Sequence, residues 1–206
     1  MTVTAAIEKT YSLEAYFALE DKSVVKHEFD NGELIEMAGG TFEHNHICAH
    51  VLAALIACLS QTGKYYRAYS SDMKVYLPEF QKVVYPDGCL ILEAPESFAG
   101  RRDVLMNPLL IVEVLSDSTA AYDRGKKFES YRTIPSFREY ILVSQSEPAV
   151  EVFFLHDAEA GLWKISQASG MDAKLFLHSI GAEIALQDVY RGLTFEAIID
   201  PEQGSI

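Results

Sequence analysis

Three ionisable residues in the middle of the chain have the types and positions that metal-dependent hydrolysis requires. Glu113 lies inside the apolar run LLIVEVL, where a buried carboxylate loses several kcal/mol of hydration unless it is paired, protonated or bound to a metal. Asp87 lies in the run YPDG, and Lys127 lies in the segment after Glu113. Carboxylates are hard oxygen ligands that suit Mg²⁺, and an ammonium group can polarise the attacking water or neutralise a phosphate. Together these residues predict hydrolysis of a phosphate ester at a metal site.

Each of these residues also has an ordinary structural interpretation. Glu113 could face solvent at the edge of a sheet, and a Pro-Asp-Gly sequence such as the one at Asp87 is a common turn. Lys127 follows Asp123 by four residues, a spacing that is typical of surface ion pairs on helices. The three residues taken together favour a functional site over these structural interpretations, because two carboxylates on adjacent strands and a lysine on the next helix can meet at one point.

The elements that would position these residues can be predicted from apolar periodicity and turn signals. The expected helices cover residues 12–22, 41–61 and 119–133. The expected strands cover a hairpin within 26–40 that turns at Asn-Gly, then 65–77, 82–93 with a Pro-Asp-Gly break inside it, 109–115 and 139–143. A second hairpin is expected within 149–178, before a tail with a short helix or strand. The succession of strand, helix and strand over 109–143 predicts a right-handed crossover between parallel strands.

The composition is that of one globular domain. The chain has 206 residues, 49% of them hydrophobic, and we expect a single domain made of an N-terminal helix and hairpin (1–40), a catalytic core (41–145), and a C-terminal hairpin and tail (146–206). No apolar run has the length of a membrane span, the N-terminus lacks the features of a secretory signal, and the three cysteines lack disulfide-framework spacing. We therefore expect a cytoplasmic protein with reduced thiols and no membrane partner.

The charge balance bears on the choice of substrate. A formal net charge of −13 argues against binding nucleic acid through many phosphates and favours small or neutral partners. Basic residues nevertheless gather in one short stretch, which comprises Arg124, Lys126, Lys127, Arg132 and Arg138. This stretch could form a local basic surface.

A second set of possible metal ligands lies at the start of the long predicted helix. The set comprises His44, His46, Cys48 and His50. Residues two apart point to opposite sides of a helix, so only His44 with Cys48, or His46 with His50, shares a face. Neither pair has a clear third ligand in the sequence, so we favour a core role for the thiols over a zinc site.

Several motifs resemble those of the Uma-two restriction endonuclease family, a branch of the PD-(D/E)XK nuclease superfamily. The similarity rests on HEFDNGELIEMAGG, on the aspartate after a proline, on PLLIVEVLSDST and on DRGKKFESYRTIPSFREYILV. The resemblance implies an α/β fold with a restriction-endonuclease-like core, in which helices flank a mixed sheet. It also implies Mg²⁺ or Mn²⁺ as the cofactor and hydrolysis of DNA phosphodiester bonds.

The resemblance also assigns roles by position. Asp87 and Glu113 match the motif carboxylates that hold the metal, and the backbone carbonyl of Val114 would be a further ligand. The superfamily lysine should lie two residues after the glutamate, but that position is Leu115. Lys127 matches a lysine displaced onto the helix, with Lys126 as the less favoured substitute. Supporting roles fall on the remaining family positions, which are Glu28, Glu33, His44, Asp123 and Tyr131.

Two other functions compete with DNA cleavage. The acidity and the displaced lysine favour a nuclease-fold protein that binds or regulates without catalysis. A hydrolase of a small phosphorylated substrate would suit the negative charge better than duplex DNA. By analogy with nucleases that cut both strands as symmetric pairs, we expect a homodimer.

Overall fold

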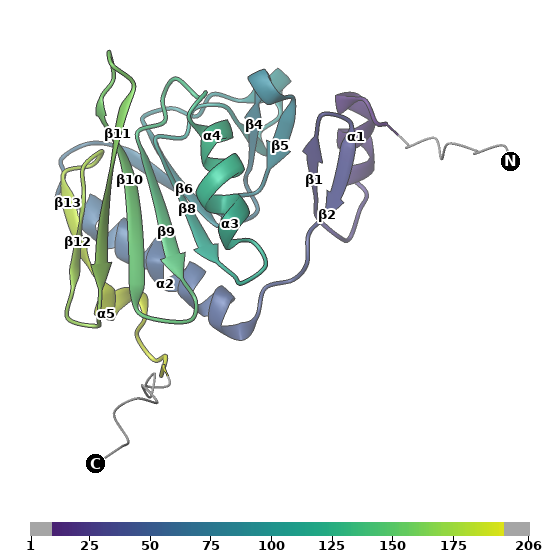
Figure 1. The fold of residues 1–206 in the computed structure, drawn as a ribbon. Coiled ribbons are helices and arrows are strands. Elements are labelled where there is room, and N and C mark those ends of the chain that lie inside the picture. Colours follow the sequence, from purple (N-terminus) through teal and green to yellow (C-terminus); the bar gives the residue numbers. More distant parts are fainter. Residues whose placement is uncertain (1–9, 196–206) are drawn as a thin grey trace, which may run out of the picture.

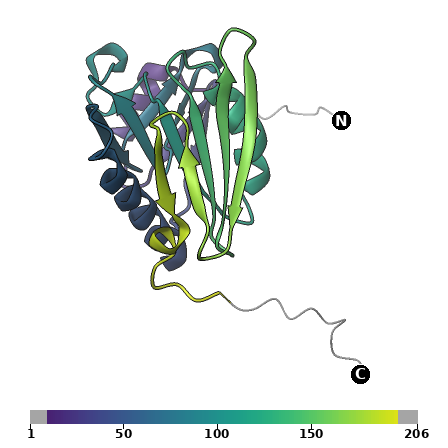
Figure 2. The ribbon, with the colours of Figure 1, turned by 90° about the vertical axis from the view of Figure 1, so that its left-hand side faces the viewer.

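The structure, a computed structural model, describes residues 10–195. Within these residues three sheets are flanked by helices (Figures 1 and 2), which confirms the predicted mixed α/β class. The helical elements are α1 (Leu13–Glu20), α2 (Phe42–Leu59), α3 (Ala120–Tyr122), the π-helical segment η3 (Asp123–Lys127), α4 (Phe128–Tyr131), α5 (Leu186–Val189), and the 3-10 turns η1 (Pro78–Phe80) and η2 (Phe98–Gly100). Ser12 and Thr41 cap α1 and α2 through their side-chain oxygens.

The largest sheet carries the strand on which Glu113 lies. Its order is β11-β10-β9-β8-β6-β3. The strands are β3 (Tyr66–Ser70), β6 (Gly88–Leu92), β8 (Leu110–Leu115), β9 (Glu139–Ser144), β10 (Ala149–Asp157) and β11 (Leu162–Ser169). β8 and β9 run parallel, as the predicted crossover requires, and the other neighbours in this sheet are antiparallel.

The second sheet contains the N-terminal hairpin. Its order is β2-β1-β5-β4-β7, with β1 (His27–Asp30), β2 (Glu33–Glu36), β4 (Lys74–Leu77), β5 (Lys82–Val84) and β7 (Val104–Leu105). Asn31 and Gly32 both have positive φ, which is the conformation that a tight hairpin turn needs. β12 (Lys174–Leu177) and β13 (Ala182–Ala185) form a separate pair.

Two of the predicted strands are each divided between the two larger sheets, so the prediction of single strands over 65–77 and 82–93 is wrong. Between β3 and β4 the chain turns, and the Met73 N–H donates to the Ser70 carbonyl. Between β5 and β6 the break falls at Pro86, which has no N–H with which to continue a ladder. Asp87 therefore lies where the chain leaves one sheet and enters the other.

Helices cover opposite faces of the six-stranded sheet (Figure 1). On one face Ile47 and Val51 of α2 share a core with Val112 and Val114 of β8. On the other face Tyr131 of α4 shares a second core with Ile111 and Leu115 of β8. Because side chains alternate along a strand, Glu113 points to the face that is covered by α3, η3 and α4.

The α2 helix corrects one expectation from the sequence. By length and composition alone it is apolar enough to cross a membrane, although no such run was expected. The core helix of a globular domain meets the same criterion, and Ile47, Val51 and Leu55 are buried against the sheet. These three buried residues are 17% of the helix, so packing against the sheet accounts for part of its apolar composition.

Candidate active site

Glu113 is the centre of a buried polar cluster. The residue is 4% exposed, so the alternative of a solvent-facing edge position is wrong. Its Oε1 atom lies 2.8 Å from Lys127 Nζ and accepts a hydrogen bond from the Tyr131 hydroxyl, also at 2.8 Å. Among the described residues no hydrogen bond reaches the other oxygen, Oε2. One oxygen of a fixed carboxylate is thus available to a ligand.

Lys127 is enclosed by carboxylates from three elements. Besides Glu113, its ammonium lies 3.6 Å from Asp123 Oδ1 and 3.8 Å from Glu28 Oε1. Both Asp123 and Lys127 belong to the π-helical segment η3, whose extra residue per turn buries both side chains on the sheet side. Burial alone would lower the pKa of Lys127, but the surrounding carboxylates outweigh burial and raise it. The lysine therefore stays charged.

The same burial acts on the acidic members of the cluster. Burial raises the pKa of Glu113 to about 8, the negative charge of Asp87 adds to this, and Lys127 opposes it. The pKa of Tyr131 is raised well above its ordinary value by burial and by the charge of Glu113, so its hydroxyl remains a donor. A cation that replaced the missing hydration would favour the ionised form of Glu113.

Asp87 lies beside Glu113 and is fixed at both carboxylate oxygens. Gly88 pairs with Val112 in the antiparallel register of β6 and β8, which brings Asp87 level with Glu113. Its Oδ2 atom accepts a hydrogen bond from the Val114 N–H at 2.7 Å, and its Oδ1 atom lies 3.2 Å from His44 Nε2. The hydrogen bond to Asp87 raises the pKa of His44, although burial acts against it.

Cys48 adds a sulfur atom to this side of the site. It follows His44 by one helical turn, and the ligand atoms of His44, Cys48 and Asp87 all lie within 4.8 Å of one another. Burial and the nearby Asp87 carboxylate raise the pKa of the thiol. The sequence contains the His44 and Cys48 pair, but the third member, Asp87, comes from the bend between β5 and β6 and joins them only in the fold.

Most of the predicted site residues are brought together. Glu28, His44, Asp123 and Tyr131 all contact Asp87, Glu113 or Lys127. Glu33 is not among them, because it is exposed on β2 and pairs with Asp30 across the hairpin. In this structure Val114 contributes its N–H to Asp87, and a role for its carbonyl stays a prediction.

Two tyrosines in the cluster were not predicted. The Tyr85 N–H donates to Glu28 Oε1 at 3.1 Å, and the Tyr140 hydroxyl donates to the Asp123 carbonyl at 3.2 Å. Both lie in apolar runs that predict core packing, and a backbone donor leaves no signal in the sequence. They hold Glu28 and the start of η3 in place around Lys127.

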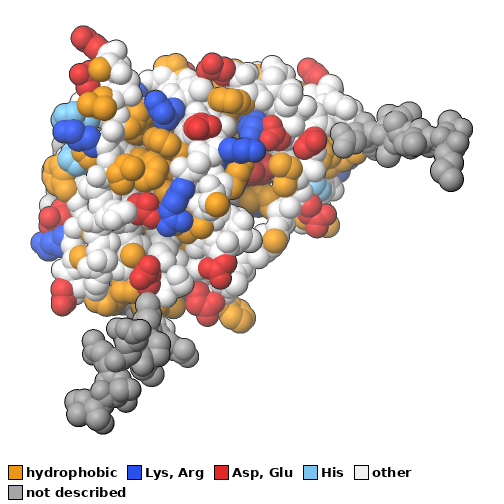
Figure 3. Space-filling model, in the orientation of Figure 1, with side chains coloured by type: hydrophobic (Ala, Val, Ile, Leu, Met, Phe, Trp, Pro, Cys, Tyr) orange, Lys and Arg blue, Asp and Glu red, His pale blue; other side chains and the backbone are white. Residues whose placement is uncertain are grey.

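The basic stretch noted in the sequence does not form one surface. Lys127 is buried, Lys126 is exposed, and Arg124 pairs with Glu151 at 2.6 Å. Figure 3 shows acidic and basic side chains interspersed over the face in view. The remaining members, Arg132 and Arg138, line an open pocket of about 490 Å³.

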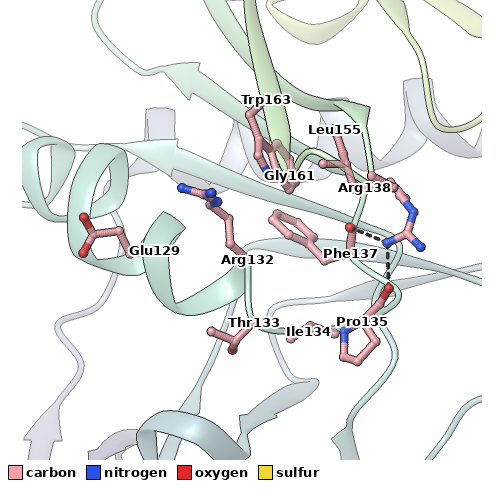
Figure 4. Close-up of a pocket in the computed structure, with 11 residues that line it drawn as sticks. Glu129, Arg132, Thr133, Ile134, Pro135, Phe137, Arg138, Leu155, Gly161 and Trp163 are labelled. Carbon is pink, nitrogen blue, oxygen red and sulfur yellow. Dashed lines mark hydrogen bonds between the residues drawn. The ribbon is translucent and has the colours of Figure 1, made fainter.

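In this pocket the two arginines flank aromatic side chains (Figure 4). Arg138 Nη1 donates to the carbonyls of Pro135 and Phe137, and the Arg132 guanidinium lies 6.0 Å from the centre of the Trp163 ring. Neither arginine has an acidic partner within the described part of the chain. The pocket thus offers cationic groups beside a π surface in an otherwise acidic protein.

Comparisons with known proteins show which family the chain resembles. The sequence pattern of the Uma2 family, described as "Putative restriction endonuclease", matches residues 13–187. Two uncharacterized proteins of Synechocystis sp. are similar: sll1609 is 33% identical, over 84% of this chain and 96% of its own length. The second, slr1290, is 34% identical, over 89% of this chain and 93% of its own length.

A solved structure shares the fold. The crystal structure of "a putative nuclease belonging to DUF820" from Anabaena variabilis superposes with a TM-score of 0.67 at 13% identity. The match covers 87% of this chain and 97% of that one. At this identity the likeness speaks for the arrangement of sheets and helices and not for the activity.

Proposed function

Because this chain belongs to the Uma2 family, and so to a family of nuclease fold, we propose that it is a metal-dependent endonuclease that hydrolyses DNA phosphodiester bonds. The observation that carries the proposal is the buried cluster of Glu113 with Lys127 beside Asp87. Burying three carboxylates, those of Glu28, Glu113 and Asp123, together with an ammonium costs stability that apolar side chains would not cost. A site that must bind a cation and a phosphate gives a reason for that cost.

The residues present fit a divalent cation. Asp87 and Glu113 would hold Mg²⁺ or Mn²⁺, with the Val114 carbonyl as a third oxygen donor. The fit is supported by Glu113 Oε2, to which no described residue donates a hydrogen bond, and by the position of Asp87 level with Glu113 on the neighbouring chain segment. When bound, the cation lowers the pKa of a water and offsets negative charge on the phosphate.

The protein groups position and assist the reaction. Lys127, kept charged by Glu113, Asp123 and Glu28, would orient the attacking water or neutralise the phosphate. The Tyr131 hydroxyl fixes the orientation of Glu113, and the Val114 N–H together with His44 fixes Asp87. These contacts supply the preorganisation on which such catalysis depends.

The test is plasmid cleavage with Mg²⁺ or Mn²⁺. Lys127→Met should lower cleavage by about 10²-fold or more, since removal of one preorganised electrostatic group typically costs about that. Lys126→Met is the matched control, because it removes the same charge from an exposed neighbour and should leave cleavage unchanged.

Removal of Lys127 also leaves three carboxylates without a cation, so folding must be checked. Asp87→Asn keeps the shape of the side chain and serves as the second variant, with thermal unfolding as the check. Cleavage by folded Lys127→Met and Asp87→Asn at wild-type rates would contradict the proposal.

A binding protein without catalysis is the second candidate, favoured by the net charge of −13 and by a Glu113 already paired with Lys127 and Tyr131. The same assay separates the two candidates, because a protein without catalysis would leave the plasmid intact with either metal. We also infer a homodimer, as two active sites would cut two strands, and a cytoplasmic location, which the three free cysteines support.

A further inference from the structure

We propose that His44, Cys48 and Asp87 form a second metal site, which binds a thiophilic transition-metal ion such as Zn²⁺ and shares Asp87 with the Mg²⁺ site. The site itself stands on the geometry of these residues. Only its effect on cleavage rests on the proposed function.

The three ligand atoms already lie close to the arrangement that zinc needs. All lie within 4.8 Å of one another, and His44 Nε2 is 3.2 Å from Asp87 Oδ1. Bond lengths of about 2.0–2.3 Å place neighbouring ligands of a tetrahedral zinc about 3.3–3.8 Å apart. A small contraction of side chains therefore suffices. The helix presents His44 and Cys48 on one face, since they are four residues apart in α2.

The chemistry of the set selects the ion. A thiolate and an imidazole are ligands that Zn²⁺ and similar ions prefer, whereas Mg²⁺ is bound through oxygen. Binding would release the Cys48 proton to solvent, because the thiolate is the ligand form. The side chains of His44 and Asp87 are 20% and 16% exposed, which leaves a route for the ion and an open fourth position for water.

The two other histidines of α2 do not belong to this site. His46 Nε2 lies 2.6 Å from the Arg191 carbonyl, and His50 Nδ1 lies 3.0 Å from the Asp188 carbonyl. These contacts hold α2 against α5 and the residues that follow it. The rings stack on each other with centroids 4.2 Å apart. The fourth ligand is therefore a water and not a histidine.

The experiment titrates the full-length protein with Co²⁺, whose thiolate complexes give a charge-transfer band in the near ultraviolet. The wild type should show the band, and Zn²⁺ should abolish it by displacement. Cys48→Ser should remove the band and weaken Zn²⁺ binding by more than about 100-fold, since loss of even an outer-shell partner costs about 10–100-fold.

Two controls separate this site from the rest of the molecule. Cys58→Ser alters a partly buried thiol on the same helix, which donates to the Leu55 carbonyl, and should keep the band. Glu113→Gln should also keep it, because Glu113 is not a ligand of this ion. A wild type without the band, or a band of equal strength in Cys48→Ser, would overturn the proposal.

The shared aspartate predicts the effect on cleavage. Zn²⁺ should inhibit Mg²⁺-dependent cleavage in the wild type at concentrations about 100-fold below those needed in Cys48→Ser, following the loss of affinity. Equal inhibition in both proteins would contradict the sharing of Asp87. The Co²⁺ titration does not require cleavage, so it decides the metal site even if the nuclease proposal fails.

Discussion

Tyr131 offers the mildest way to disturb the buried cluster. Its hydroxyl donates to Glu113 Oε1, while its ring packs against Phe137 and Tyr140. Tyr131→Phe removes the donor and keeps the ring. Because a hydrogen bond to a carboxylate favours the ionised form, its loss should raise the pKa of Glu113 further above the value of about 8 that burial gives it.

The direction in which cleavage depends on pH follows from the raised pKa of Glu113. In the proposed mechanism the metal binds ionised Glu113, so kcat/KM for cleavage should rise with pH as Glu113 loses its proton, and this rising limb should move to higher pH in Tyr131→Phe. The protein should also lose about 1–3 kcal/mol of stability, measured by denaturant unfolding. A limb that stays in place or moves to lower pH would show that Tyr131 does not stabilise the carboxylate.

Sequence reasoning reached some of these residues for identifiable reasons. Glu113 could be found because a charge in an apolar run is conspicuous, and Asp87 because proline and glycine interrupt a strand. Lys127 needed the family resemblance, since an Asp-Lys pair four apart is ordinary on helices. Cys48 could not be placed beside Asp87, because a thiol on a helix and a carboxylate at a strand end meet only through tertiary packing.

At the scale of elements, the π-helical segment η3 determines where Lys127 points. Gly125 lies within it, and a Cβ there would meet nothing within 4 Å. Gly125→Ala should therefore keep the site and stabilise the protein by about 0.5–1 kcal/mol through helix propensity.

Deletion of Gly125 should have a different effect. An α-helix turns by about 100° per residue, so losing one residue would rotate Lys127 away from Glu113. Cleavage should fall to the level of Lys127→Met, with the fold retained as judged by circular dichroism. Full activity in the deletion variant would show that η3 is not what positions the lysine.

Element boundaries were predictable where local chemistry sets them. The caps Ser12 and Thr41 and the Asn-Gly turn mark their helices and hairpin in the sequence. The division of residues 65–77 and 82–93 between two sheets was not predictable, because each half is apolar enough for a strand. Each half joins one sheet or the other by pairing with a strand from elsewhere in the chain, namely β1, β6 or β8.

At the scale of the whole molecule, a net charge of −13 must be reconciled with the proposed DNA substrate. The pocket around Arg132 and Arg138 is where cations without acidic partners lie beside Trp163. We expect these arginines to contact the DNA backbone. The double variant Arg132→Ala/Arg138→Ala should weaken DNA binding and reduce the salt slope by roughly 1–2, as each phosphate contact contributes about 0.9.

The control for that measurement is Arg191→Ala, which removes an arginine that pairs with Asp188 on the surface. It should leave the salt slope unchanged. An unchanged slope in the double variant would place the DNA elsewhere. The wild type, the double variant and Arg191→Ala should bind Mg²⁺ equally well, since none of these arginines contacts Asp87 or Glu113.

The cluster around Lys127 joins two sheets that otherwise belong to separate hydrogen-bonded layers. Glu28 comes from β1 of the five-stranded sheet, and Glu113 comes from β8 of the six-stranded sheet. The ion pairs of the Lys127 ammonium group therefore depend on how the two sheets are aligned. Any slippage between the layers would separate the lysine from one of its acids before the surrounding apolar packing is lost, so catalytic competence should disappear earlier than the fold on gentle heating.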